Sequence, residues 1–158
     1  MRRARGQSIL YVVLLMPTLI LVFALTVEVA QLQMQRLRLG YAVDLATVSA
    51  ATAVDAGYYA QTGRLRLDHD AAVAVTRTYL GQNLTASLGQ SQAALVAAAA
   101  DITVINQTPG ADPYTGARLD RPSVSARIHV PYRLTLLGFV GSVGAGRLTL
   151  AAHAEIRP

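Results

Sequence analysis

The sequence predicts an α+β fold: a long N-terminal helix, then shorter helices, then a small antiparallel sheet. Three observations lead to this prediction. An apolar run near the N-terminus continues into a helical repeat of apolar residues, and an alanine-rich region follows it. Two segments near the C-terminus then alternate apolar and polar residues, as half-buried strands do. Helices therefore come first along the chain and strands come last.

A charged tail, residues 1–8, stands directly before an apolar run over residues 9–30. The run has 22 residues, of which only Glu28 is charged. At about 1.5 Å per residue, a helix of this length covers the hydrocarbon core of a bilayer, roughly 30 Å. A cleaved secretory signal is the competing interpretation, but its apolar part is normally shorter and no clean small-x-small cleavage site follows here. We therefore predict a retained transmembrane helix.

The charges favour one orientation of this helix. Arg2, Arg3 and Arg5 precede it, and Arg36 and Arg38 follow it, so the positive-inside rule places the N-terminus in the cytoplasm and the rest of the chain outside.

The net charge is +5, yet the arginines are scattered and are not interleaved with aromatic residues, which argues against nucleic acid as a partner. The absence of cysteine excludes disulfides, thiol catalysis and cysteine metal sites.

The helical pattern continues past the membrane. Apolar residues recur at intervals of three and four, which predicts that residues 31–56 extend the same helix and pack an apolar stripe on a globular domain. The stripe consists of Val27, Ala30, Met34, Leu37, Tyr41, Leu45, Val48 and Ala51. Gly57 is the first convincing stop, and Pro17 is expected to kink the helix. Glu28 is expected at the headgroup level, either as an interfacial carboxylate or paired with an arginine of another subunit.

Residues 57–158 are predicted to form the α+β domain. The stretch "GYYAQTGRL" is interpreted as a turn-rich connection, followed by a helix whose N-cap is Asp68 or Asp70. Further elements are predicted from alanine content and from alternation. They are a helix over Ser91 to Ala100 and strands over Asp101 to Gln107, Ser123 to Tyr132 and Leu148 to Arg157. The loop "TPGADPYTGARLDRP" joins the first two strands.

No residue pattern in this chain predicts catalysis, a cofactor or a metal. The run Asp68-His69-Asp70 starts a helix, where consecutive side chains fan out instead of converging on one ion. His129 and His153 lie on the polar side of predicted strands and are possible cross-strand neighbours, but they lack a third ligand. Two glycosylation sequons, at Asn83 and Asn106, are interpreted as chance occurrences. The chain is therefore predicted not to be an enzyme and not to bind a small-molecule substrate.

Two features favour contacts with other proteins or with lipid. Gly40, Ala42 and Ala46 are small residues that let another helix or a sheet approach closely, although packing on the chain's own sheet is the favoured explanation. The connection from Arg133 to Gly146 is apolar where a polar loop is usual, and it contains Leu137 and Phe139. These residues either cap the core or form an exposed patch for a partner or the membrane.

Four features occur in this order along the chain: the stretch "RGQSILYVVLLMP", the acidic residue at the far end of the apolar run, the segment "AVDLATVSAATA" and the closing "LTLAAHAEI". With these features the sequence resembles TadE/TadG-like proteins of tight-adherence (Flp-type) pilus assembly. The resemblance is strongest over residues 5–56. It implies a pilin-like architecture and a single-pass protein of the bacterial cytoplasmic membrane, acting as a structural minor pilin or pseudopilin. The implied partners are other pilin or pseudopilin subunits, the assembly platform and the lipid bilayer.

The resemblance also implies a candidate leader cleavage between Gly6 and Gln7. Related sequences of the form "RGxxAVEFALVLP" carry a glutamate six residues before the proline, whereas here Tyr11 stands six residues before Pro17. A carboxylate in lipid is costly unless it meets a partner, so this difference favours a retained leader over entry into a major filament. The alternative function is a membrane-tethered extracytoplasmic binding or sensor module with its site in the loop over residues 108–122.

Overall fold

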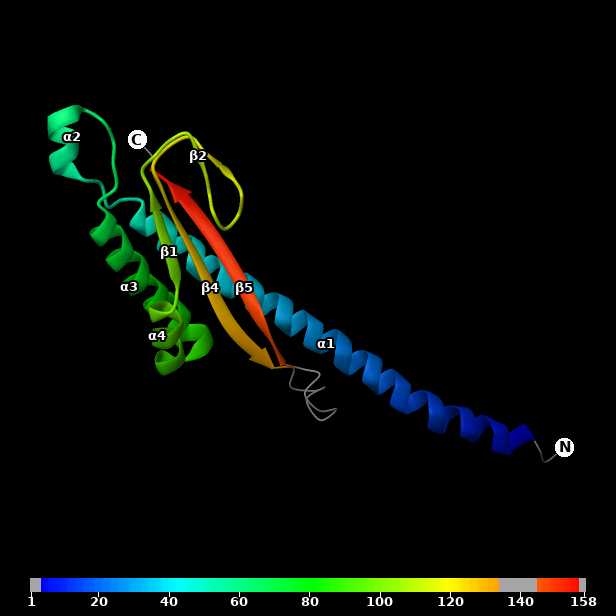
Figure 1. Ribbon diagram of the computed structural model, residues 1–158. Coiled ribbons are helices and arrows are strands. Elements are labelled where there is room, and N and C mark those ends of the chain that lie inside the picture. The colour runs from blue at the N-terminus through cyan, green and yellow to red at the C-terminus, as the bar shows by residue number, and fades with distance from the viewer. Residues whose placement is uncertain (1–3, 134–144, 157–158) are drawn as a thin grey trace. The chain divides into compact units, whose positions relative to one another are not determined.

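The computed structural model describes residues 4–133 and 145–156, and it confirms the predicted α+β class (Figure 1). The chain divides into two compact units. One unit comprises residues 1–34 and 132–146, and the other comprises residues 35–131 and 147–158. Leu137 and Phe139, which were expected either to cap the core or to form an exposed patch for a partner or the membrane, lie outside the described residues.

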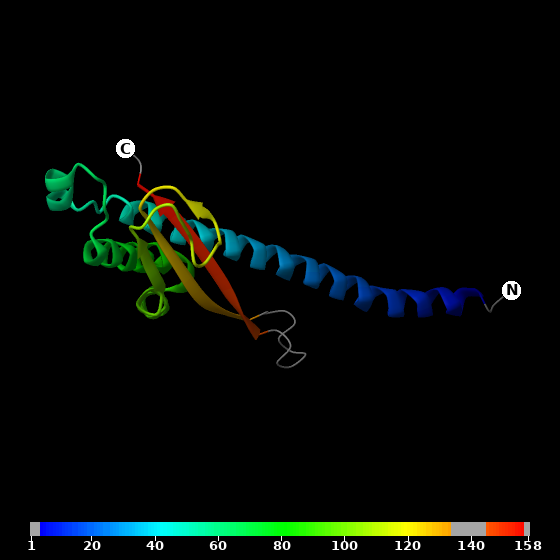
Figure 2. The same ribbon diagram turned by 45° about the horizontal axis from the view of Figure 1, so that its top comes forward.

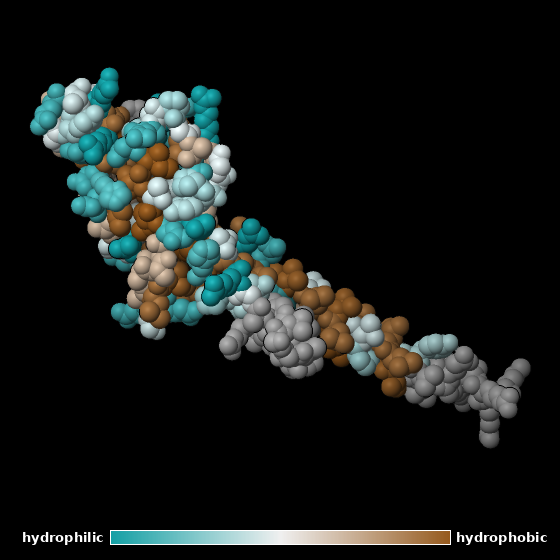
Figure 3. Space-filling model, in the orientation of Figure 1, coloured by the Kyte–Doolittle hydropathy of each residue, from teal (hydrophilic) through white to brown (hydrophobic). Residues whose placement is uncertain are grey.

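Helix α1 runs from Ala4 to Ala50 and contains Pro17. Within the first unit most of its side chains from Tyr11 onward are exposed, and hydrophobic side chains are visible along it in Figure 3. Among the described residues, one helix is long and apolar enough to cross a membrane, and it is this one. The hydroxyl of Thr18 donates to the carbonyl of Leu14, in the same turn in which Pro17 lacks a backbone N–H and cannot donate a helical hydrogen bond.

Glu28 differs from its neighbours on α1. Leu25 and Val29 are exposed, but Glu28 is only 4% exposed, so protein atoms cover its carboxylate. The sequence predicts an interfacial position for this residue and gives no sign of such burial. A buried carboxylate is costly unless polar groups compensate it, which sets Glu28 apart from an incidental charge at the end of a membrane span.

The second unit is built on a three-stranded antiparallel sheet. The strands are β1 (Asp101–Ile105), β4 (Ser123–Arg133) and β5 (Ala145–Glu155), in the order β1-β4-β5. In the β1–β4 ladder Asp101 pairs with Arg127 and Ile105 pairs with Ser123. The predicted alternation in β4 is confirmed, because Val124, Ala126, Ile128 and Val130 are all buried on one face.

Helices cover the buried face of this sheet. They are α3 (His69–Leu88), α4 (Gln90–Ala98) and the part of α1 that belongs to this unit (Figures 1 and 2). The main core cluster joins all of these elements. It includes Leu39, Ala42, Val43 and Ala46 of α1, Leu80 and Leu84 of α3, Ala93 and Val96 of α4, and Ile128 and Leu150 of the sheet.

The predicted packing stripe on α1 is wrong. Leu37, Tyr41 and Val48 were expected against the sheet but are exposed, and the helix instead buries the opposite face, which carries Ala42 and Ala46. Alanines on the buried face let the helix axis come close to the sheet, whereas a tyrosine there would hold the two layers apart. The buried face combines these alanines with Leu39 and Val43, and hydrophobicity alone does not distinguish it from the exposed face.

The helix boundaries also differ from the prediction, most of all after residue 50. Helix α1 ends at Ala50 and not near Ala56, and a short helix, α2 (Ala56–Thr62), occupies much of the expected turn-rich connection. Asp55 caps α2, because its carboxylate accepts the N–H of Tyr58, and Gly63 ends it at φ +67°. An aspartate and a glycine bracketing seven residues are the sequence signal for α2, and its tyrosines obscure that signal.

Helix α3 begins as predicted, with Asp68 as the N-cap: its carboxylate accepts the N–H of Ala71 at 3.0 Å. Replacing Asp68 with alanine removes this acceptor, and we expect the free energy of unfolding of the full chain in detergent to fall by about 1 kcal/mol. Chemical denaturation measures the change. Asp68→Asn keeps an acceptor at the same place and is expected to recover most of the loss. Equal losses in the two variants would show that the cap does not contribute.

Candidate functional site

An exposed apolar face on α1 is the first candidate surface of the second unit. We call Leu37, Tyr41, Leu45 and Val48 the α1 stripe. Their exposed fractions are 67%, 71%, 49% and 56%, respectively. The intervals of four, four and three residues place them along one side of the helix. Four large apolar side chains aligned on one exposed face are unusual for a protein that works alone in water.

The small residues singled out in the sequence divide between two roles. Ala42 and Ala46 are buried in the chain's own core, so they serve the packing of α1 on the sheet. Gly40 is half-buried, and apart from its chain neighbours and the adjacent helix backbone no atom lies within 4 Å of where its Cβ would be. Tyr41 points away from the core and belongs to the α1 stripe. This helix segment therefore has two faces: one packs on the chain's own sheet, and the other is exposed.

The other predicted positions lie in the first unit. The backbone of Gly6 and Gln7, the candidate cleavage site, is within helix α1. Tyr11 is exposed. Together with Pro17, these residues follow one another along a single helix, so the structure assembles no site from them.

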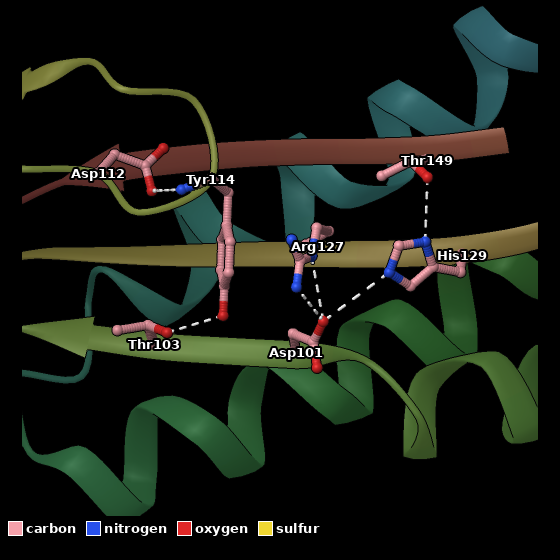
Figure 4. A network of polar contacts seen from close by, with 7 residues as sticks. All are labelled: Asp101, Thr103, Asp112, Tyr114, Arg127, His129 and Thr149. Carbon is pink, nitrogen blue, oxygen red and sulfur yellow. Dashed lines mark hydrogen bonds and ion pairs between the residues drawn. The ribbon is translucent and has the colours of Figure 1, made fainter.

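Polar side chains form a network on the outer face of the sheet (Figure 4). Arg127 of β4 donates to Asp101 of β1 through Nη2 at 2.8 Å and through Nε at 3.1 Å. The guanidinium carbon of Arg127 lies 4.7 Å from the centre of the Tyr114 ring, and the Tyr114 hydroxyl is 2.8 Å from Thr103 Oγ1. Tyr114 belongs to the loop between β1 and β4, so the network fastens this loop to the sheet.

A tight turn holds the tip of the same loop. The strands β2 (Gly110–Ala111) and β3 (Arg118–Leu119) form a small hairpin around Asp112, which is buried. The carboxylate of Asp112 accepts the N–H groups of Tyr114 and Thr115 and the hydroxyl of Thr115. Gly116, at φ +72°, provides the left-handed residue that such a hairpin needs.

The environment of Asp112 favours its charged form. Burial raises the pKa of this carboxyl, but the hydrogen bonds from the Thr115 hydroxyl and from the backbone N–H groups of Tyr114 and Thr115, together with the nearby Ser125 side chain, lower it more. The pKa therefore lies below its usual value of 3.8. The alternation of β4 places Ser123 and Ser125 on the same side as Arg127 and His129, yet both serines are buried, and Asp112 and Tyr114 of the loop contact this face. The tip of the loop over residues 108–122 is thus committed to the fold.

The histidines do not pair with each other as considered from the sequence. His129 Nδ1 lies 3.0 Å from Thr149 Oγ1, and its Nε2 lies 3.9 Å from an Asp101 oxygen. His153 Nδ1 lies 3.6 Å from an Asp112 oxygen. Each histidine therefore faces an aspartate of its own. Across the described parts of the chain, no group of three or more acidic or histidine side chains gathers closely enough to hold a metal ion.

The family comparison concerns the long helix. Residues 6–53 match the Tad family model, whose description is Flp pilus-assembly TadE/G-like. The chain carries a TadE/G-like segment. The resemblance inferred from the sequence is thereby confirmed. No curated protein and no solved structure matches the chain.

The TadE/G-like segment covers most of α1 and includes the whole α1 stripe. The match supports a role in the assembly of a Flp-type, tight-adherence pilus, which is a structural role and not a catalytic one. An N-terminal apolar helix fits a single-pass membrane protein of such a system. Pilus components are accordingly the class of partner that the family indicates.

The lowered pKa of Asp112 predicts acid sensitivity. A carboxyl whose pKa is depressed by folding contributes stability above its unfolded pKa, and that contribution is lost as the pH falls through the folded value. We expect the free energy of unfolding of the full chain in detergent to fall below about pH 4. Asp112→Asn is expected to lower stability by about 1–3 kcal/mol at pH 7, because the turn loses a charged acceptor, and to flatten this acid dependence.

Chemical denaturation at pH 7 and at about pH 3 measures both effects. Asp44→Asn removes a charge from an exposed position on α1 and serves as the control. An unchanged acid dependence in Asp112→Asn would contradict the assignment.

Proposed function

We propose that this chain is a minor pilin-like or pseudopilin-like structural subunit in the assembly of a tight-adherence pilus. The apolar helix anchors the subunit in the bacterial cytoplasmic membrane, with the N-terminus inside and the second unit outside. The α1 stripe packs against the corresponding helix of a neighbouring subunit. The sheet domain provides contacts to other subunits and to the assembly platform. The family match and the exposed stripe support this proposal.

The single observation that carries the proposal is the pair of opposite faces on α1. One face is filled by Ala42 and Ala46 packing on the sheet, so the helix is already held by its own domain. The stripe is therefore not needed for folding, yet it exposes large apolar side chains at every turn from Leu37 to Val48. A helix presented in this way fits a parallel helix of another subunit, since both are anchored in the same membrane.

The alternative function, a tethered sensor with its site at the loop over residues 108–122, has less support at the loop tip. Asp112 is buried in the turn, and Tyr114 is held between Thr103 and Arg127. Both groups are engaged within the chain. A ligand at the tip would have to replace these contacts.

Helix packing through the α1 stripe predicts that Tyr41→Glu abolishes or strongly reduces surface pili without unfolding the subunit. Tyr41 is 71% exposed, so the change should alter the free energy of unfolding by no more than about 0.5 kcal/mol. Tyr79→Glu makes the same substitution at an exposed tyrosine of α3 and serves as the matched control. Pilus yield is measured in sheared surface fractions, and normal piliation with Tyr41→Glu would contradict the proposal.

Cross-linking tests the contact directly, because the chain has no cysteine of its own. Tyr41→Cys is expected to form cross-links with a neighbouring pilin-like subunit in membranes, either a second copy or a related chain carrying a cysteine at its own stripe. Tyr79→Cys is expected to form none.

Retention of the leader is a separate prediction. Since Tyr11 replaces the glutamate that stabilises a processed pilin in a filament, we expect intact-mass spectrometry to find the full-length chain in the membrane fraction. A form that starts at Gln7 and is enriched in sheared filaments would contradict retention and would identify a processed filament subunit.

A further inference from the structure

Helix α2 and the turns around it form an excursion that contributes nothing to the core. The excursion comprises residues 55–66, and α2 has no buried residue. Tyr59 is 51% exposed, and Leu65, Arg64 and Arg66 are exposed as well. A segment that buries little apolar surface gains little from folding, so its ordered conformation has to be held from outside.

Hydrogen bonds hold the two ends of the excursion together. Val54 and Leu67 form an isolated bridge, with Asp55 N–H donating to the Arg66 carbonyl at 2.8 Å and Asp68 N–H donating to the Ala53 carbonyl at 2.9 Å. The side chain of Asn106 adds two more bonds. Its Oδ1 accepts the N–H of Leu67 at 2.8 Å, and its Nδ2 donates to the carbonyl of Leu67 at 3.1 Å. Asn106 thus pairs with Leu67 as a neighbouring strand would.

A polar pocket of about 840 Å³ lies along the flank of the excursion. One side is formed by Tyr58, Arg64 and Arg66. The other side is formed by Gln107 and Thr108, which follow soon after the end of β1. Its volume is in the range of small-ligand sites. None of the described residues that line it is acidic.

The charges of the pocket are available to a ligand. The guanidinium carbon of Arg66 lies 5.3 Å from the centre of the Tyr58 ring, which orients this arginine without neutralising it. Within the described parts of the chain, neither Arg64 nor Arg66 forms an ion pair. The nearby Asp55 is used as the cap of α2, and Asp120 pairs with Arg118. Two cations therefore face a pocket that contains no counter-charge among its described residues.

We propose that this pocket binds an anionic saccharide that carries carboxylates. Guanidinium groups recognise carboxylates through paired hydrogen bonds, and Gln107 and Thr108 offer donors and acceptors for hydroxyl groups. The exposed part of the Tyr58 ring provides an apolar surface for a sugar ring. An acidic protein segment is less well matched, because Leu65 and Pro122 are the pocket's main aliphatic side chains and protein interfaces usually have a larger apolar centre.

Calorimetric titration of the full chain in neutral detergent tests the proposal. The probes are tri-galacturonate, the neutral trisaccharide galactotriose and the acidic peptide penta-glutamate. We expect tri-galacturonate to bind, with an affinity that falls as salt is added, and galactotriose to bind at least about tenfold more weakly. Arg64→Ala and Arg66→Ala are each expected to reduce the affinity for tri-galacturonate by about tenfold or more, because each removes a charged donor.

Arg77→Ala is the matched control, since Arg77 is an exposed arginine of α3 outside this pocket. It is expected to change the affinity by less than about twofold, and the circular dichroism of all three variants should match the parent chain. Three results would overturn the proposal: no binding of tri-galacturonate at low salt, an equal loss in Arg77→Ala, or equal binding of galactotriose. Binding of penta-glutamate as tightly as tri-galacturonate would reassign the pocket to an acidic protein segment.

Discussion

The close packing of α1 on the sheet is the constraint on which the rest of the second unit depends. Ala42 and Ala46 bring the helix near to Ile128 and Leu150, and the same cluster receives α3 and α4. Each alanine contributes little apolar area by itself, but together they set the separation of the two layers. Leu39 and Val43 pack beside these alanines, whereas Leu37, Tyr41, Leu45 and Val48 of the same helix segment face outward. Folding thus uses one face of this helix and leaves the other exposed.

The outer face of the sheet shows how a loop becomes part of the fold. Asp112 is a buried carboxylate that accepts hydrogen bonds from Tyr114 and Thr115 of its own turn, and Tyr114 reaches Thr103 and Arg127. Such networks are stable when every member has a partner and costly when one is lost. The loop tip therefore behaves as a cover of the sheet, whereas the start of the loop, at Gln107 and Thr108, stays open beside α2.

Most of the fold could be predicted from the sequence, because its local signals agree with its packing. The alternation in β4 and the cap at Asp68 both follow from neighbouring residues alone. The orientation of α1 could not be predicted, because Tyr41 and Ala42 are both apolar and only the space beneath the helix distinguishes them. The burial of Ser125 could not be predicted either, because it depends on the preceding loop, which folds back over the strand and places Asp112 beside this serine. The candidate sites could not be predicted for the same reason. The pocket beside α2 is lined by both Arg64 and Gln107, which are far apart in the sequence, and no local sequence pattern connects them.

The pairing of Asn106 with Leu67 has a consequence for producing this protein. Asn106 begins the sequence Asn-Gln-Thr, which the secretory pathway of a eukaryotic host modifies while the chain is still unfolded. A glycan attached to Nδ2 would occupy the place where the Leu67 carbonyl now lies 3.1 Å away. The sugar would then hold open the base of the excursion beside α2. Expression in bacteria avoids this modification and preserves the surface that the excursion presents.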